Sequence, residues 1–172
     1  TQTVVLNASC GATLPAYTAA SRADNCGTPA VSQLPASGLA LSGVGTTVVT
    51  LTATDGSNNT ATCSFNVNRV DNTVPAITCP GTQTIALGAN CTASLPAYNP
   101  VSISDNCATA PSATQTPASG STVSGVGSTT VTLTANDGNG NTATCSFSVT
   151  RVDNIAPTIN IGRAQSRARE ET

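Results

Sequence analysis

The residues with the most chemistry available to them are the cysteines, of which there are seven in 172 residues. They form no CxxC pair, their spacings are too wide and irregular for a zinc ribbon, and the chain contains no histidine, so zinc binding is disfavoured. Thiols at this density favour disulfide bonds made in an oxidising compartment. The seven are Cys10, Cys26, Cys63, Cys79, Cys91, Cys107 and Cys145.

Carboxylates are the second group that can do chemistry, and they are few. Asp71 and Asp153 each precede an asparagine, and Asp137 opens the turn Asp-Gly-Asn-Gly-Asn. Calcium takes about six to eight oxygen ligands, which such turns can supply. Asp and Asn also suit turns without any metal, because they tolerate left-handed backbone. We favour the second explanation and expect no cofactor, with calcium at Asp71, Asp137 and Asp153 as the alternative.

The chain offers little to a catalytic mechanism. Lysine and histidine are absent, the glutamates lie only in the last residues, and the aspartates lie in predicted turns. Serine and threonine are abundant, but the sequence shows no obvious base that would activate them. We therefore expect that the protein is not an enzyme.

Three asparagines, Asn7, Asn58 and Asn90, stand in Asn-x-Ser/Thr sequences, which accept N-linked glycans. In a chain this rich in asparagine and threonine, such sequences also arise by chance. Glycosylation at these three sites is one of two explanations that the sequence leaves open.

Charged residues are scarce. The net charge is −2 and only 8% of the residues are charged, so no field steers the chain toward nucleic acid or anionic lipid. No apolar run approaches the length of a membrane span. We expect neither nucleic-acid binding nor membrane insertion. Since the chain starts at Thr1 and shows no signal peptide, we expect a mature or fragmentary product.

Apolar residues alternate with polar ones along the chain, which is the pattern of half-buried strands. Cys63, Phe65 and Val67 share one face of a predicted strand, with polar residues between them. Residues 46–54 alternate in the same way, and the turn at 55–59 connects them to that strand as a hairpin. No apolar period of 3.6 residues persists for two helical turns. The sequence therefore predicts an all-β fold.

The sequence repeats itself once, which predicts the domain organisation. TQTVVLNASC at Thr1 matches TQTIALGANC at Thr82, and the match continues at an offset of 81 and then 82 residues. A repeat of this length is a whole small domain. The predicted domains are residues 1–71 and 72–153, followed by a C-terminal strand and tail at 154–172. Such small domains with thin cores usually need covalent support.

Several segments of the chain resemble the HYR (hyalin repeat) module, an immunoglobulin-like β-sandwich of extracellular proteins. The matching segments are DNTVPAITCP, SDNC and VSGVGSTTVTLTANDGNGNTATCSFSVTRVD. With its additional cysteines, the chain is similar to modules of large bacterial surface proteins. The resemblance covers residues 1 to about 161. It implies two tandem immunoglobulin-like domains in an extracellular or cell-surface protein.

The resemblance also implies a disulfide pairing. Simple HYR modules carry one cysteine at the Cys-Pro start and one in the last strand, and these two would pair across the sandwich. The additional cysteines of each repeat would pair with each other. Cys63 would then be unpaired or bonded to another molecule, because its partner would precede Thr1. The implied pairs are Cys79–Cys145, Cys91–Cys107 and Cys10–Cys26.

The two ends of the chain are complementary. The first repeat lacks the opening strand that residues 75–80 give to the second, and the C-terminal end carries a spare equivalent. Donation of that strand to the next molecule would build a head-to-tail filament. A window cut from a longer array would have the same ends, with neighbouring repeats as partners, and both explanations stay open. The spare strand is Ala156, Pro157, Thr158, Ile159, Asn160 and Ile161.

We therefore expect a structural subunit of an extracellular fibre or filament. The alternative is the stalk or ligand-binding repeat of a cell-surface adhesin. Sugar binding would need exposed aromatic rings, and only Tyr17 and Tyr98 are available, each in a Leu-Pro-Ala-Tyr segment that suits a core equally well. A third class, the accessory domain of an enzyme, would differ only in what is attached. The Arg-rich end of the chain matches nothing in the family.

Overall fold

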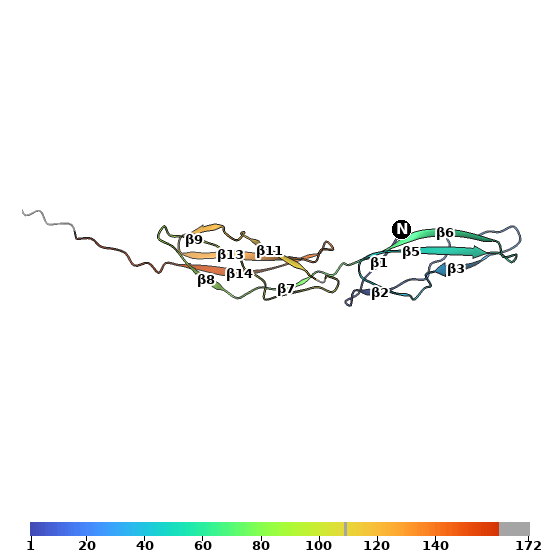
Figure 1. The fold of residues 1–172 in the computed structure, drawn as a ribbon, viewed down its shortest axis with the longest axis horizontal. Helices are drawn as coiled ribbons and strands as arrows, with labels where there is room; N and C mark the ends of the chain where they lie inside the picture. Colours follow the sequence, from blue (N-terminus) through green and yellow to red (C-terminus); the bar gives the residue numbers. More distant parts are fainter. Residues whose placement is uncertain (109, 162–172) are drawn as a thin grey trace, which may run out of the picture.

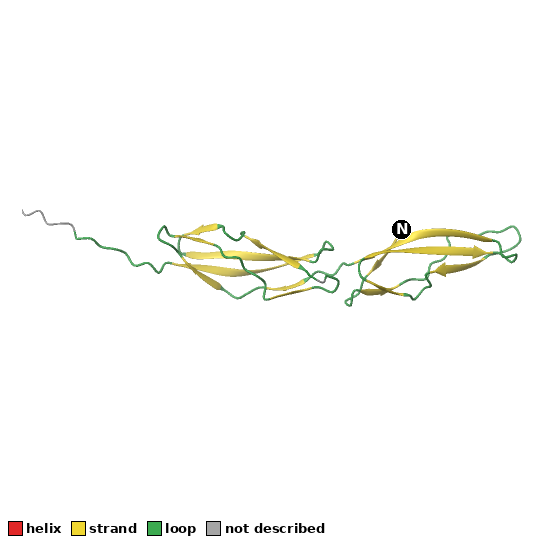
Figure 2. Ribbon diagram, viewed as in Figure 1, coloured by secondary structure: helices red, strands yellow, loops and turns green. Residues whose placement is uncertain are grey.

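The computed structural model describes residues 1–108 and 110–161, and all regular structure within them is β-strand. Two domains lie end to end and give an elongated molecule (Figure 1, Figure 2). Domain 1 contains β1 to β6, domain 2 contains β7 to β14, and residues 71–75 connect them. The predicted fold class, two tandem all-β immunoglobulin-like domains, is confirmed. Among the described residues there is no helix that could span a membrane.

Domain 1 has a four-stranded sheet and a two-stranded pair. The sheet has the order β1-β6-β5-β3, with β1 parallel to β6 and the other neighbours antiparallel, while β2 pairs with β4. The strands are β1 (Gln2–Val5), β2 (Gly11–Thr13), β3 (Ala30–Leu34), β4 (Ala40–Ser42), β5 (Gly45–Thr54) and β6 (Thr60–Val70).

Domain 2 repeats this arrangement and adds one pair of strands. Its main sheet has the order β11-β13-β14-β8, with β8 parallel to β14, and β9 pairs with β12. The additional pair is β7 with β10. The strands are β7 (Ala76–Thr78), β8 (Gln83–Ala86), β9 (Thr92–Ser94), β10 (Ser102–Ser104), β11 (Ser112–Thr116), β12 (Thr122–Ser124), β13 (Gly127–Asn136) and β14 (Thr142–Val152).

The long hairpin β5–β6 and its copy β13–β14 form the centre of each domain. In β5–β6, Val49 lies opposite Phe65 and Leu51 opposite Cys63. The apolar residues of both strands therefore share one face, as the alternation in the sequence predicts. Asp55 closes the turn, because its Oδ1 accepts hydrogen bonds from two backbone N–H groups of that turn.

Each core is thin and contains mainly leucine and valine. The ring of Tyr17 meets that of Phe65 edge to face at 5.0 Å, and Tyr98 meets Phe147 in the same way at 5.1 Å. These two tyrosines therefore pack inside the domains rather than forming an exposed platform. The buried core residues are Leu14, Leu41, Val49, Leu51 and Val67 in domain 1, and Leu95, Val131, Leu133, Phe147 and Val149 in domain 2.

Strand β7 is the main difference between the domains. It pairs with β10 and contacts β14. In domain 1 no described strand takes this position, and residues 21–23, the equivalent of β10, form no strand. Burial changes accordingly: Ala135 and Phe147 are buried, whereas Ala53 and Phe65 at the same positions of domain 1 are only half-buried. The core of domain 1 is thus left partly uncovered.

Candidate cation site at the domain junction

A disulfide bond between Cys10 and Cys107 joins the two domains. The two Cα atoms are 4.9 Å apart, within the usual disulfide range of roughly 4.4–6.8 Å. The main chain at residues 71–75 is the other covalent connection. The junction therefore has two tethers, one of backbone and one of sulfur.

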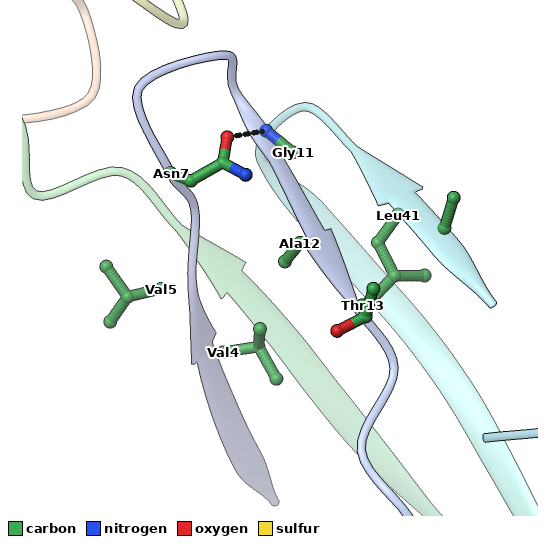
Figure 3. A pocket seen from close by; sticks show the side chains of 8 residues that line it. Val4, Val5, Asn7, Gly11, Ala12, Thr13 and Leu41 are labelled. Atoms are coloured by element: carbon green, nitrogen blue, oxygen red, sulfur yellow. Dashed lines mark hydrogen bonds between the residues drawn. The ribbon is translucent and has the colours of Figure 1, made fainter. Parts of the chain in front are cut away.

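The side chain of Asn7 holds the turn that carries Cys10. Asn7 Oδ1 accepts hydrogen bonds from the N–H groups of Ser9 at 2.9 Å and Gly11 at 3.0 Å, the second of which is drawn in Figure 3. Cys10 has a φ of 55°, in the left-handed region that few non-glycine residues adopt. The turn thus fixes the position of Cys10 at the edge of domain 1 that meets domain 2.

The facing turn of domain 2 runs from Asp105 to Cys107. Asp105 Oδ1 accepts hydrogen bonds from the N–H groups of Cys107 and Ala108, both at 2.8 Å. The side chain between them, Asn106, donates from Nδ2 to the carbonyl oxygen of Asn7 at 2.9 Å. One short turn therefore supplies both a hydrogen bond and a sulfur atom to the junction.

The structure corrects two of the implied disulfide pairs. It contains neither Cys10–Cys26 nor Cys91–Cys107, because Cys10 is bonded to Cys107 instead. Cys26 and Cys91 are exposed thiols. One additional cysteine from each repeat thus joins the two domains, and neither repeat is clipped internally by its own additional pair.

The length of a domain explains this correction. The Cys26 turn lies beside the β5–β6 hairpin turn, since Asp24 and Asp55 line one hollow. The Cys10 turn lies at the other end of β6, just beyond Leu6, whose N–H group bonds to the carbonyl of Val70. Strand β6 has 11 residues, and a strand of that length spans roughly 35 Å. Cysteines close in sequence are therefore far beyond disulfide reach.

The structure joins Cys79 to Cys145, which is the pair that the resemblance implies for domain 2. Their Cα atoms are 5.6 Å apart. Cys79 directly follows β7 and Cys145 lies in β14, so the bond fastens β7 to the main sheet. Cys63, the equivalent of Cys145 in domain 1, is an exposed thiol. No described strand like β7 lies beside it.

Three aspartates from both domains meet at the junction. Asp71, Asp105 and Asp137 each offer a carboxylate oxygen, and these atoms all lie within 4.8 Å of one another. Asp71 follows β6, Asp137 follows β13, and Asp105 opens the turn that carries Cys107. Only 4% of Asp71 and 6% of Asp137 is exposed. Two of the three carboxyl groups are therefore almost completely removed from water.

The predicted metal ligands are only partly brought together. Asp71 and Asp137 meet, whereas Asp153 is exposed beyond β14 and takes no part in the cluster. Sequence reasoning missed Asp105, although a signal was present. The six aspartates occupy three pairs of equivalent positions, and the junction takes one member of each pair. The pairs are Asp24/Asp105, Asp55/Asp137 and Asp71/Asp153.

Amide groups satisfy part of the cluster and leave part of it open. Asn141 Nδ2 donates to Asp137 Oδ2 at 2.6 Å and to the carbonyl oxygen of Asp71 at 3.0 Å, so it bridges the domains. Asp105 Oδ2 is buried and accepts no hydrogen bond, and the same holds for Oδ1 of Asn106. A buried oxygen without a donor costs free energy unless another group compensates it.

Asp137 stays ionised at neutral pH. Burial raises the pKa of its carboxyl group, but the side-chain amide of Asn141 and the backbone N–H groups of residues 139–141 outweigh burial and lower the pKa below its ordinary value. The chain contains no lysine or histidine. The guanidinium group of Arg69 donates to the carbonyl oxygen of Ser42.

These residues suit a hard divalent cation. Carboxylate and amide oxygens are the ligands that Ca²⁺ prefers, and water can fill its remaining positions. A cation between Asp71, Asp105 and Asp137 would offset the repulsion among the carboxylates and touch both domains. The arrangement can therefore couple cation binding to the docking of one domain on the next.

Comparison within the chain shows that docking creates this site. Asp55, which is equivalent to Asp137, is only half-buried at the free end of domain 1. Asp153, which is equivalent to Asp71, is exposed at the free end of domain 2. The same residue types therefore form a buried cluster only where two domains meet.

A groove lies along domain 1 where β7 lies in domain 2. It is open to solvent along the uncovered side of β5 and β6, next to the free thiol of domain 1. Its lining residues include Ala19, Ser21, Leu51, Ala53, Cys63 and Phe65.

The predicted donor strand, residues 156–161, forms no strand in this chain. Ile159 is 92% exposed and Ile161 is 96% exposed. The rest of the predicted tail, residues 162–172, lies outside the described residues. An apolar segment thus projects from the end of domain 2.

The three predicted glycan acceptors are all exposed. Asn58 lies in the β5–β6 turn with a φ of 68°, and Asn90 lies in the turn before β9. Asn7 differs from them, because its side chain holds the Cys10 turn. A glycan on Asn7 would compete with that role.

Both domains match the HYR domain family, over residues 2–69 and 70–151. The chain is 41% identical over 125 residues to hyalin of Lytechinus variegatus, a match that covers 68% of this chain and 23% of hyalin. This relative is from a sea urchin, so the bacterial type that the resemblance suggested is not supported.

Two solved structures have weak similarity to the chain. PcdhgB3 EC1-4 is 14% identical, with a TM-score of 0.30, over 88% of this chain and 48% of that one. Mouse clustered PcdhgC3 EC1-3 is 16% identical, with a TM-score of 0.27, over 63% of this chain and 42% of that one. At these TM-scores neither structure bears on fold or function.

Proposed function

Because the chain belongs to the HYR domain family, we propose that it is a structural, non-catalytic subunit of an extracellular fibre, built from disulfide-bonded repeats that associate head to tail. One observation carries this proposal. The groove that β7 fills in domain 2 is open in domain 1, and a segment equivalent to β7 projects unpaired from the C-terminal end.

The projecting segment has the side chains that the groove requires. In domain 2, Ile77 and Cys79 pack from the β7 segment onto the core. Ile159 and Ile161 stand at the equivalent positions, two residues apart, so both would point to the same face of a strand. Burying each would contribute roughly 1.5–3 kcal/mol. The next copy's groove at Leu51 would provide the apolar surface.

Such an association would join two different surfaces of the molecule. The donor segment follows β14 at one end of the molecule, and domain 1 forms the other end (Figure 1). The acceptor groove lies in domain 1. A contact between different surfaces of identical copies generates an open array unless a rotation closes it. The same groove would accept the preceding repeat if the chain is part of a longer array.

The disulfides support an extracellular location. Cys10–Cys107 and Cys79–Cys145 are the kind of structural bond that persists in oxidising compartments and is rare in the cytosol. The chain is also homologous to hyalin. We therefore place the fibre outside the cell.

Light scattering coupled to size-exclusion chromatography over a wide range of concentrations tests the proposal. We expect species larger than a monomer, and fewer of them for Ile159→Ser. The matched control is Val48→Ser, which changes an exposed valine on β5 outside the groove lining. A chain that stays monomeric at high concentration would contradict strand donation, as would equal assembly of the two variants.

The alternative, a ligand-binding repeat of an adhesin, has less support among the described residues. Tyr17 and Tyr98 pack against phenylalanine rings and form no platform for sugars. The hollow in Figure 3 is lined by aliphatic and small polar side chains such as Val4, Val5 and Thr13. Charged groups that would orient a ligand are not among its lining residues.

A further inference from the structure

The interdomain disulfide has an equivalent at each free end of the chain. Cys10 of domain 1 bonds to Cys107 of domain 2. Cys91 is the counterpart of Cys10, and Cys26 is the counterpart of Cys107. Both counterparts are exposed thiols. The two halves of a second junction bond are therefore present, one at each end of the molecule.

The turn around Cys91 already has the geometry of the bonded Cys10 turn. The backbone angle φ of Cys91 is 56°, compared with 55° for Cys10. In both turns the cysteine carbonyl accepts a hydrogen bond from a glycine N–H group, from Gly125 at 3.0 Å and from Gly43 at 2.9 Å. The backbone of Cys91 therefore needs no rearrangement to take the role of Cys10.

The turn around Cys26 shares with its counterpart the hydrogen bond from the cysteine N–H group to the aspartate two residues before it. The N–H group of Cys26 donates to Asp24 Oδ2 at 2.9 Å, and the N–H group of Cys107 donates to Asp105 Oδ1 at 2.8 Å. Each free cysteine thus stands in a turn whose copy is bonded within the same chain.

Cys26 and Cys91 cannot bond within one molecule. Cys26 lies beside the β5–β6 turn at the far end of domain 1, and Cys91 precedes β9 at the end of domain 2 where β14 finishes. Two domain lengths separate them, each roughly 35 Å by the length of its long strand. A second copy of the chain, placed end to end with the first, can bring the two thiols together.

The other halves of the junction lie at the same two ends. Asp153 stands at the Cys91 end, and Asp24 and Asp55 stand at the Cys26 end, in the positions of the three aspartates that meet between the domains. The donor segment and the groove are divided in the same way. The free thiols, the aspartates and the donor segment with its groove therefore all predict the same contact, in which the C-terminal end of one copy meets domain 1 of the next.

We propose that Cys91 of one copy forms a disulfide bond with Cys26 of the next copy, which turns the head-to-tail array into a covalent polymer. This inference rests on the proposed function, because it requires the array. It gives a role to Cys26 and Cys91, the two free thiols that stand in the same kind of turn as the bonded Cys107 and Cys10.

The chemistry balances with a small disulfide as the oxidant. The thiolate of one cysteine attacks a disulfide such as oxidised glutathione, forms a mixed disulfide and releases one glutathione thiol. The second cysteine then attacks the mixed disulfide and releases another. Two protein thiols lose two protons and two electrons, and one glutathione disulfide becomes two thiols.

Cys63 provides an internal control. Its bonded counterpart, Cys145, pairs with Cys79, but Ile161 stands at the position of Cys79 in the donor segment. A copy that donates residues 156–161 therefore brings no thiol to Cys63. The proposed polymer uses Cys26 and Cys91 and leaves Cys63 as a thiol.

The test oxidises concentrated protein in a glutathione redox buffer and separates it on non-reducing gels. We expect a ladder of covalent multimers for the wild type and for Cys63→Ser, and no ladder for Cys26→Ser or Cys91→Ser alone. A mixture of Cys26→Ser and Cys91→Ser should give a covalent dimer and nothing larger, because each variant keeps one usable end. Peptide mapping should recover a Cys26–Cys91 link.

Two results would overturn the inference. One is a ladder that persists in either single variant, and the other is an oxidised wild type without the Cys26–Cys91 peptide. The double variant Cys26→Ser/Cys91→Ser separates this failure from that of the proposed function. If the double variant still assembles in light scattering while the oxidised wild type yields no Cys26–Cys91 peptide, only the covalent bond is excluded. If both the double variant and the wild type stay monomeric, the head-to-tail array itself is excluded.

Discussion

Replacing Cys79 and Cys145 together with alanine is expected to lower the free energy of unfolding of domain 2 by about 4 kcal/mol. The two cysteines are 66 residues apart in sequence. In the chain-entropy model, a cross-link that closes a loop of this length contributes about 4 kcal/mol at 25 °C, because it restricts the unfolded chain. The double replacement creates no unpaired thiol beyond the three that the wild type already has.

Differential scanning calorimetry checks this prediction. Domain 1 contains no internal disulfide and no equivalent of β7 among the described residues, so we expect it to unfold first and domain 2 to unfold at a higher temperature. For a domain of this size, a loss of about 4 kcal/mol lowers the midpoint by roughly 15–30 °C. The upper transition should therefore move close to the lower one in the double variant.

Cys63→Ala is the matched control, because it removes an exposed thiol at the equivalent position of domain 1. It should leave both transitions in place. An upper transition that does not move when Cys79 and Cys145 are replaced would refute the reasoning, since the bond would then contribute nothing to domain 2. A single transition in the wild type would show that the two domains unfold as one unit.

Three further predictions concern the junction and the core. Added Ca²⁺ should raise the melting temperature of the wild type and of Asp55→Asn but not that of Asp137→Asn. An equal rise in all three proteins would show that the junction aspartates do not bind the cation. The pKa of Asp137 is lowered because hydrogen bonds outweigh burial, and the pKa of Asp55 is lowered chiefly by its hydrogen bond with Asn59. The stability that both carboxylates contribute should therefore be complete above the unfolded pKa near 3.8 and be lost as the pH falls through the lower folded pKa values. Unfolding monitored by circular dichroism from pH 6 to about pH 2 should show this loss, and stability that rises below pH 4 would contradict it. Tyr98 has a buried hydroxyl group without a hydrogen-bond partner, and burial raises its pKa. In urea unfolding, Tyr98→Phe should therefore leave the free energy of unfolding unchanged or raise it by up to about 1 kcal/mol. A clear loss of stability would show that the hydroxyl has a partner.

The hairpins at the centre of each domain could be predicted from sequence because their signal is local. Alternation places Cys63, Phe65 and Val67 on one face, and the Asp55 turn sets which residues lie opposite them. A strand that is buried on one face specifies its own register, since a slip by one residue would expose every apolar side chain. Neighbouring residues alone are enough for this inference.

The disulfide between the two domains could not be predicted in the same way. The family resemblance implied the pair Cys10–Cys26, whereas Cys10 bonds to Cys107 of the other domain. The sequence does not show how one domain is placed against the next, and that placement decides which turns meet. Asp105 was missed for the same reason, because it joins the cluster only across the junction.

Much of the chemistry of this chain therefore lies between its domains. The Cys10–Cys107 bond and the three aspartates each combine groups from two consecutive repeats. A single tether between domains allows them to swivel, whereas a second covalent tether beside the short linker removes that freedom. Each free end of the molecule carries one of the two cysteine turns that form such a bond. A repeat added to either end could therefore be held by a backbone linker or strand contact together with a disulfide. Stiffness along an array would then be set at its junctions, where a reductant or a chelator can act, and not in the thin cores.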